Sequence, residues 1–224
     1  MSDASTHWAP DEGVAILGGG GFAREAYWYL RDAGLVHIAF VDDTTERTSL
    51  RMAGCDVPVV RDWDFAALPF PVRRYVVGVG APHVKRVLIE RAAAAGLAPG
   101  PTVCARGGQA FGRDNVVGPG GVICPGTYVT THVTLGAHVI LNLGVTVGHD
   151  AVIGDRCTLN PGAHVSGNVR LGADVLVGTG AAFREGVTVA DGVVIGAQAC
   201  IVKDVLEPGI VVGGVPARPL PPRP

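Results

Sequence analysis

One short segment of the chain holds three side chains suited to acid–base chemistry. Asn142, His149 and Asp150 lie within the run Asn-Leu-Gly-Val-Thr-Val-Gly-His-Asp. Imidazole can take up a proton at neutral pH, so His149 could accept one from an attacking amine or hydroxyl. The carboxylate of Asp150 could orient the ring or favour its protonated form, and Asn142 could hold the acceptor. The residues alone leave a second interpretation open, in which His149 is an ordinary solvated histidine.

A second candidate site is the glycine run Gly18, Gly19, Gly20 and Gly21, between a short apolar segment and a helix-like one. It fits the G-x-G-x-x-A spacing, in which backbone N–H groups and a helix N-terminus can hold a phosphate. Asp42 and Asp43 follow the next strand-like segment about 20 residues on, where an acidic side chain can bind a ribose hydroxyl. Gly80, after a later strand, could form the other lip of this cleft. A tight turn without a ligand, and a plain turn at Gly80, remain the alternatives.

The glycine run does not predict a nicotinamide cofactor. The segment that contains it, residues 13–98, lacks the second mononucleotide-binding half that holds a nicotinamide. A single half can bind one nucleotide, such as the carrier end of a nucleotide-linked sugar. A metal site is not predicted either, because zinc enzymes need converging histidines and the spacing does not provide them. The histidines concerned are His132, His138, His149 and His164, with gaps of 6, 11 and 15 residues.

The elements that must position these residues are indicated by a period of six. Apolar residues occupy every sixth position: Phe111, Val117, Ile123, Val129, Leu135, Leu141, Val147, Ile153, Leu159, Val165, Leu171, Val177, Phe183, Val189, Ile195 and Ile201. The residue two before each is mostly small or branched, and the residue after it is often glycine. A helix would repeat at about 3.6 residues and a single strand at 2. The period therefore predicts a parallel β-helix of hexapeptide repeats, in which three sixes make one triangular coil.

Upstream of this period the pattern changes. Residues 13–98 alternate apolar strands with helix-like stretches, which predicts a small α/β domain with a parallel sheet, a Rossmann-like half. The predicted organisation is a disordered tail at 1–12, this domain at 13–98, the β-helix at 99–205, and a C-terminal loop and tail at 206–224. Pro99, Gly100 and Pro101 suggest a hinge between the two main parts.

Composition excludes several classes of function. The net charge of the 224 residues is only −2, which gives no electrostatic reason to expect nucleic-acid binding. No run of 18 apolar residues occurs and the first residues are polar, so we expect no membrane segment and a cytoplasmic protein. The five cysteines are an odd number without a C-x-x-C pair and are expected to be reduced thiols, with Cys157 in the core.

Together, these motifs resemble the bacterial hexapeptide acyltransferases that acetylate nucleotide-linked amino sugars, a group related to the sialic-acid O-acetyltransferases. The resemblance covers nearly the whole chain. It is carried by residues 15–24, 40–43, 77–80, 140–150 and 212–218. The segments 140–150 and 212–218 are specific in combination, whereas the glycine run alone is not.

The resemblance implies a left-handed β-helix that forms a homotrimer, with acetyl-CoA as co-substrate in the groove between adjacent prisms. It implies that the N-terminal domain binds a UDP- or GDP-linked sugar, that His149 is the general base beside Asp150 and Asn142, and that a backbone N–H near Gly167 faces the thioester oxygen. Thr158, Gly178 and Gly196 are expected on the acetyl-CoA side. Some relatives carry a second histidine where this chain has Thr158.

The expected activity is acetyl transfer from acetyl-CoA to the amine of a nucleotide-linked deoxy-amino sugar. Two alternatives stay open among enzymes: O-acetylation of a sugar hydroxyl, and transfer of a longer acyl group. A non-catalytic nucleotide-binding scaffold is the third.

Overall fold

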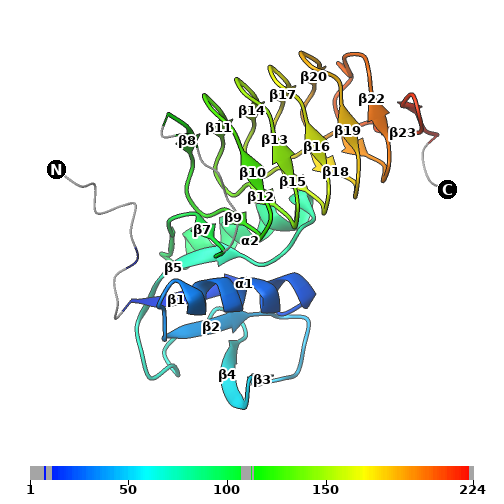
Figure 1. The fold of residues 1–224 in the computed structure, drawn as a ribbon. Coiled ribbons are helices and arrows are strands. Elements are labelled where there is room, and N and C mark those ends of the chain that lie inside the picture. The colour runs from blue at the N-terminus through cyan, green and yellow to red at the C-terminus, as the bar shows by residue number, and fades with distance from the viewer. Residues whose placement is uncertain (1–7, 9–11, 107–111, 113, 222–224) are drawn as a thin grey trace.

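The computed structural model describes residues 8, 12–106, 112 and 114–221. It contains an α/β domain packed beneath the first coils of a parallel β-solenoid (Figure 1). Most of the tail predicted at 1–12 lies outside the described residues. Phe111, the first member of the six-residue series, lies outside them as well. Within the tail, Trp8 packs on the core of the α/β domain and Glu12 forms an ion pair with Arg74 at 2.9 Å.

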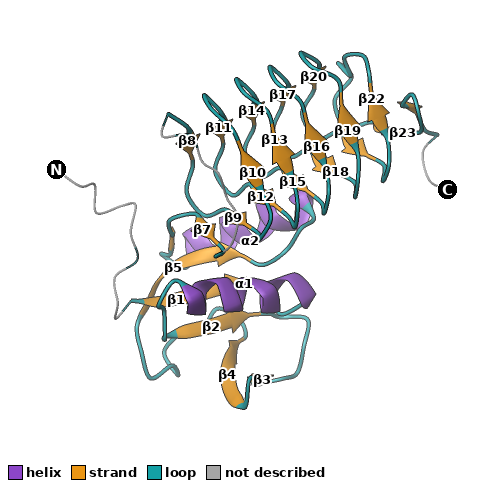
Figure 2. Cartoon of the chain, in the orientation of Figure 1, coloured by secondary structure: helices purple, strands orange, loops and turns teal. Residues whose placement is uncertain are grey.

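The α/β domain is a six-stranded sheet with two helices, each of which connects two adjacent parallel strands (Figure 2). In chain order its elements are β1 (Gly13–Leu17), α1 (Gly21–Asp32), β2 (Ile38–Val41), β3 (Ser49–Met52), β4 (Cys55–Val60), β5 (Val72–Val77), α2 (Pro82–Ala94) and β6 (Ala98–Pro99). The strand order is β3-β4-β2-β1-β5-β6, parallel except for the β3–β4 hairpin. The carboxyl ends of β1 and β5 therefore lie side by side, which brings Gly18 next to Val79.

The solenoid has three sheets, and from β8 to β22 each strand pairs in parallel with the strand 18 residues away, as in Leu135 with Ile153. The first sheet contains β10 (Tyr128–Val129), β13 (Thr146–Val147), β16 (His164–Val165), β19 (Ala182–Phe183) and β22 (Cys200–Ile201). The second contains β8 (Val116–Val117), β11 (Thr134–Leu135), β14 (Val152–Ile153), β17 (Arg170–Leu171) and β20 (Thr188–Val189). The third contains β7 (Val103–Cys104), β9 (Val122–Ile123), β12 (Ile140–Leu141), β15 (Thr158–Leu159), β18 (Leu176–Val177), β21 (Val194–Ile195), β23 (Val211–Gly213) and β24 (Arg218–Pro219).

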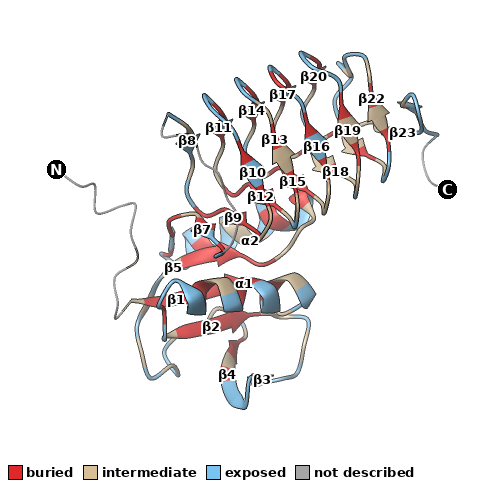
Figure 3. Ribbon diagram, in the orientation of Figure 1, coloured by how far each residue is buried: buried red, intermediate tan, exposed pale blue. Residues whose placement is uncertain are grey.

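The six-residue series forms the core of the solenoid, as predicted. From Ile123 to Ile201 every member is at most 3% exposed, and only Val117, in the first coil, is exposed among the described members (Figure 3). The corners repeat as well, because a residue with positive φ occurs at every sixth position from Gly120 to Gln198. Glycine takes about half of these positions, and His, Asp, Asn, Arg and Gln take the others. The chain is a parallel β-helix, as the period predicted, and a left-handed one, as the resemblance implied, preceded by the α/β domain.

Two connections differ from the sequence-based expectation. The segment at Pro99–Pro101 is anchored, not a free hinge: the Gly100 amide donates to the Tyr75 carbonyl at 2.9 Å, and its carbonyl accepts from Gly120 at 2.7 Å. The C-terminal part is not only loop, because β23 adds to the third sheet and places Val212 in the core. Glycine and proline on both sides of β23 concealed this strand in the sequence.

Candidate functional site

His149 and Asp150 form a hydrogen-bonded pair at a corner of the solenoid. The two residues follow β13, and Asp150 holds the positive φ of 61° that the corner requires. The His149 Nδ1 and Asp150 Oδ2 atoms are 2.8 Å apart, and both side chains are about half exposed. A carboxylate accepts from Nδ1–H, so this contact leaves Nε2 as the proton acceptor. That is the arrangement a general base needs.

Gly167 lies against the His149 ring, on the same corner one coil further along. A Cβ at position 167 would stand 2.7 Å from His149 Nε2 and 2.6 Å from Cε1, so only glycine leaves the ring in place. The Gly167 amide donates no hydrogen bond to any described residue, whereas the next amide, of Asn168, is bonded to the His149 carbonyl at 2.8 Å. A free backbone N–H beside a base is suited to bind an oxyanion.

Asn142 lies at the neighbouring corner of the same coil, and the face that carries β13 separates it from His149. Its Oδ1 accepts from the Leu143 amide at 2.8 Å, which fixes the side chain at this corner. Gly178 and Gly196 share the Asn142 corner, two and three coils further along. One protomer therefore does not bring Asn142, Gly178 and Gly196 together with His149.

Thr158 does not lie where acetyl-CoA could reach it, which corrects the expectation for this residue. Its side chain is buried, with 1% exposure, and its hydroxyl donates to the Gly80 carbonyl at 2.6 Å. Gly80 belongs to the loop between β5 and α2, so Thr158 contacts the α/β domain. The six-residue period contains no signal that the α/β domain covers this face.

The glycine run forms an open turn at the start of α1. Gly18 has a φ of +110° and packs against Val79, and a Cβ at Gly19 would touch the Asp42 carboxylate. Gly20 and Gly21 differ from these two, because nothing lies within 4 Å of a Cβ built at either position. The first turn of α1 therefore presents free space and backbone N–H groups, as a phosphate site requires.

The two aspartates after β2 point to different partners. Asp42 lies beside Gly19 and accepts hydrogen bonds from the Thr44 amide and hydroxyl through one oxygen, which leaves Oδ2 facing the glycine turn. Asp43 forms an ion pair with Arg91 at 2.7 Å and accepts from the Asp62 amide at 2.7 Å. The carboxylate of Asp43 is therefore already bound by other residues of the protein, and Asp42 is the better candidate to bind a ribose hydroxyl.

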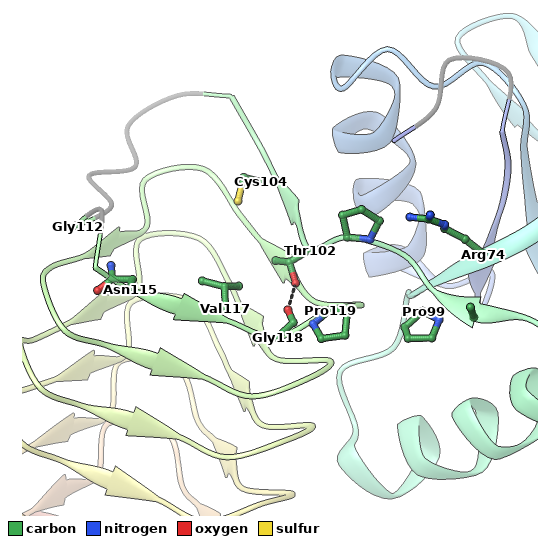
Figure 4. Close-up of a pocket in the computed structure, with 11 residues that line it drawn as sticks. Arg74, Pro99, Thr102, Cys104, Gly112, Asn115, Val117, Gly118 and Pro119 are labelled. Carbon is green, nitrogen blue, oxygen red and sulfur yellow. Dashed lines mark hydrogen bonds between the residues drawn. The ribbon is translucent and has the colours of Figure 1, made fainter. Parts of the chain in front are cut away.

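A pocket of about 750 Å³ lies elsewhere, between β6 and the first coil (Figure 4). Arg74, Thr102 and Cys104 contribute to its lining, and none of the predicted site residues does. None of its described lining residues is a histidine or a carboxylate that could act as a base. The predicted site lies instead on open corners, which a single chain cannot enclose.

Two cysteines of the solenoid, Cys124 and Cys157, are buried and do not offer a nucleophile. Burial raises the pKa of the Cys157 thiol to about 12, and burial likewise raises that of Cys124 to about 12. Thiols of this kind stay protonated and unreactive at neutral pH. Among the residues that the structure describes, no three His, Cys, Asp or Glu side chains are grouped to hold a metal ion. Neither helix of that part has the length and apolarity of a membrane span.

Comparison with solved structures gives full-length matches. The chain is similar to the acetyltransferase domain of PglB from Neisseria gonorrhoeae, with 31% identity and a TM-score of 0.80 over 93% of this chain and 100% of that one. A structure of that domain in complex with acetyl coenzyme A matches at 32% identity and a TM-score of 0.78 over 94% and 100%.

It is also similar to a histidine-to-asparagine variant of perosamine N-acetyltransferase from Caulobacter crescentus, in complex with CoA and GDP-perosamine. Here the identity is 28% and the TM-score 0.81, over 94% of this chain and 97% of that one. No protein-family model matches the chain, and a search of curated proteins found no match.

Proposed function

Because the chain belongs to the hexapeptide-repeat sugar N-acetyltransferases, which are acetyl-CoA-dependent enzymes, we propose that its own acceptor is the free amine of a UDP- or GDP-linked deoxy-amino sugar. The observation that carries the proposal is the His149–Asp150 pair with the unpaired Gly167 amide beside it. The base and the oxyanion donor are adjacent, as direct transfer requires.

This geometry supports the following reaction. The amine nitrogen attacks the thioester carbonyl carbon, the C–N bond forms, and His149 Nε2 takes the proton that the nitrogen loses. The Gly167 N–H stabilises the oxyanion of the tetrahedral intermediate. When the C–S bond breaks, CoA leaves as a thiolate that the protonated His149 can neutralise. Asp150 holds the ring through Nδ1 in both steps.

The nucleotide is assigned to the α/β domain. The N–H groups at Gly20 and Gly21 and the start of α1 suit the diphosphate, and Asp42 suits the ribose. The neighbour that holds GDP-perosamine supports a nucleotide-linked sugar as the acceptor class. We keep O-acetylation and longer acyl groups as alternatives, because no observation on this chain favours either.

The test is release of the CoA thiol from acetyl-CoA with a panel that includes GDP-perosamine and UDP-linked amino sugars. We expect turnover with at least one member, and a large loss in His149→Ala. The matched control is His132→Asn: His132 is another exposed corner histidine, paired with Asp114 at 3.1 Å, one coil before the site. The control should remain active. Absence of thiol release with every amino sugar would contradict the proposal.

We further propose a homotrimer, in which a second prism brings its Asn142 corner to the His149 corner of the first. The separation of the two corners within one chain supports this. Co-expression of His149→Ala and Asn142→Ala chains should restore active sites, to about a quarter of those of the wild type if the chains mix at random. A stable monomer in light scattering, or no restored activity in mixed trimers, would contradict the shared site.

A further inference from the structure

A buried lysine joins the two domains. Lys85, in the first turns of α2, is fully buried, and its Nζ donates to the carbonyls of His138 at 3.1 Å and Cys157 at 3.0 Å. These carbonyls belong to successive coils of the solenoid, just before β12 and β15. One side chain of the α/β domain therefore bridges two coils of the β-helix.

The Lys85 contact is specific because of what surrounds it. The His138 carbonyl accepts from no other described residue, so Lys85 alone satisfies it there. The His138 ring stacks on Tyr75 with an interplanar angle of 2°, and the Tyr75 hydroxyl lies 3.1 Å from His138 Nε2. Burial lowers the pKa of Lys85 to about 7. A neutral amine still has two N–H donors, which match the two carbonyls.

The contact also lies next to the proposed nucleotide site. The loop 78–81 leads into α2 and contacts Gly18 at one end. The Gly80 carbonyl of this loop accepts a hydrogen bond from the Thr158 hydroxyl. Thr158 and Lys85 thus fix this loop and the start of α2 to the solenoid from both sides. Every group assigned to the nucleotide lies in the α/β domain, whereas the base His149 lies on the solenoid.

We infer that Lys85 is a positioning residue: by bridging two coils it sets the α/β domain on the solenoid, so that the amine of a bound sugar is presented to the acetyl group. The inference rests on the proposed function. A one-ångström displacement of a reacting group can reduce a rate by about 100-fold, so the orientation of the domains matters for transfer. Nucleotide binding needs only the α/β domain and should not depend on Lys85.

The test compares Lys85→Met with Arg86→Met. Methionine fills a similar volume but its side chain has no N–H group, so it removes both hydrogen bonds to the solenoid. Arg86, the next residue of α2, also reaches the solenoid, but its half-exposed ion pair with Asp174 at 3.1 Å contributes little because exposed ion pairs are weak. For Lys85→Met we expect kcat to fall about ten- to a hundred-fold, while the KM for acetyl-CoA and the Kd for GDP or UDP by calorimetry change less than about two-fold. Arg86→Met should resemble the wild type.

Thr158→Val gives a second, independent variant, because it removes only the hydroxyl bond to Gly80. We expect the same direction with a smaller loss of kcat. A folded Lys85→Met protein with wild-type kcat and only a lower Tm would overturn the inference, as would an equal weakening of nucleotide binding. Hydrogen exchange does not depend on turnover: segments 72–81 and 138–140 should exchange faster in Lys85→Met than in Arg86→Met. That result would support the domain contact even if the wild type acetylated no sugar, and unchanged exchange would refute it.

Discussion

The buried Lys85 makes the stability of the protein depend on pH in a way that one substitution can isolate. Its pKa is lowered from 10.5 to about 7, first by burial and then by the charge of Arg156, against opposing effects of Cys157 and Asp174. Between pH 7 and 10.5 the unfolded chain therefore binds more protons at this lysine than the folded chain does. The contribution of Lys85 to the free energy of unfolding rises with pH in this window and is lost as the pH falls through 7.

The magnitude follows from the two pKa values. One proton gives a slope of about 1.4 kcal/mol per pH unit, so the Lys85 contribution should increase by about 1 kcal/mol between pH 7.5 and 8.5. The other buried groups with shifted pKa values change the free energy of unfolding mainly outside the interval from pH 7.5 to 8.5. Burial lowers the pKa of His138 to about 4, so its effect is complete below pH 7. The buried thiols Cys124 and Cys157 have raised pKa values, so they lower stability as the pH rises above about 9.

The assay is urea unfolding at pH 7.5 and 8.5, at one protein concentration, for the wild type, Lys85→Met and Lys203→Met. The thiols are the same in all three proteins, so their contributions cancel in the comparison. Lys203 is the other lysine of the chain and is exposed, so its variant should keep the wild-type pH dependence. Lys85→Met should lose about 1 kcal/mol of the increase. Equal pH dependence in the wild type and Lys85→Met would show that the lysine keeps its charge in the folded protein, and would refute the reasoning.

Three further predictions concern the site. His149→Ala should lower kcat by about 10²–10⁴-fold with nearly unchanged affinity for acetyl-CoA. Asp150→Asn should lower kcat less, because asparagine tolerates the positive φ at this corner. If His149→Ala keeps more than about a third of the wild-type kcat, His149 is a binding residue and not the base. Gly167→Ala should lower kcat with little change in Tm, because a Cβ there displaces the exposed His149 ring and not the core; full activity would remove Gly167 from the oxyanion role. Gly20→Val should raise the KM for the nucleotide sugar and leave that for acetyl-CoA, because the free protein has room for the side chain; a parallel change in both constants would separate the glycine turn from the sugar site.

Much of the solenoid could be predicted because its physics is local and repeated. Each sixth residue must fill the same space in the prism, so the apolar series from Ile123 to Ile201 specifies the coil without knowledge of distant contacts. The position of His149, two residues after an inward Val147, likewise predicted an exposed corner. The first helix and the strands before Gly18 and Asp42 follow from ordinary apolar patterning and the glycine turn.

The contacts between the two domains could not be predicted in this way. Nothing in the period shows which face the α/β domain covers, so Thr158 was expected to reach acetyl-CoA and instead binds Gly80. Lys85 looked like an ordinary helix residue, because its acceptors lie 53 and 72 residues further along the chain. Asp42 and Asp43 were equivalent in the sequence, and Arg91 and Asp62, both distant along the chain, distinguish them. The β3–β4 hairpin had a weak signal, the Ala53-Gly54 turn with positive φ at both residues.

The corners explain how a fold of such regular repeats can carry a site. At each corner the stacking of the coils forces a positive φ, and at Asp150 this places the residue before it, His149, outside the prism. The next coil supplies Gly167 against the ring, so base and oxyanion donor are held by the repeat itself and not by a loop. The same regularity keeps Asn142 a full face away. Stacking of the coils therefore brings together groups that lie on one corner. Groups on different corners are brought together only by a second prism. The proposed site needs both the stacking of the coils and the assembly of the trimer.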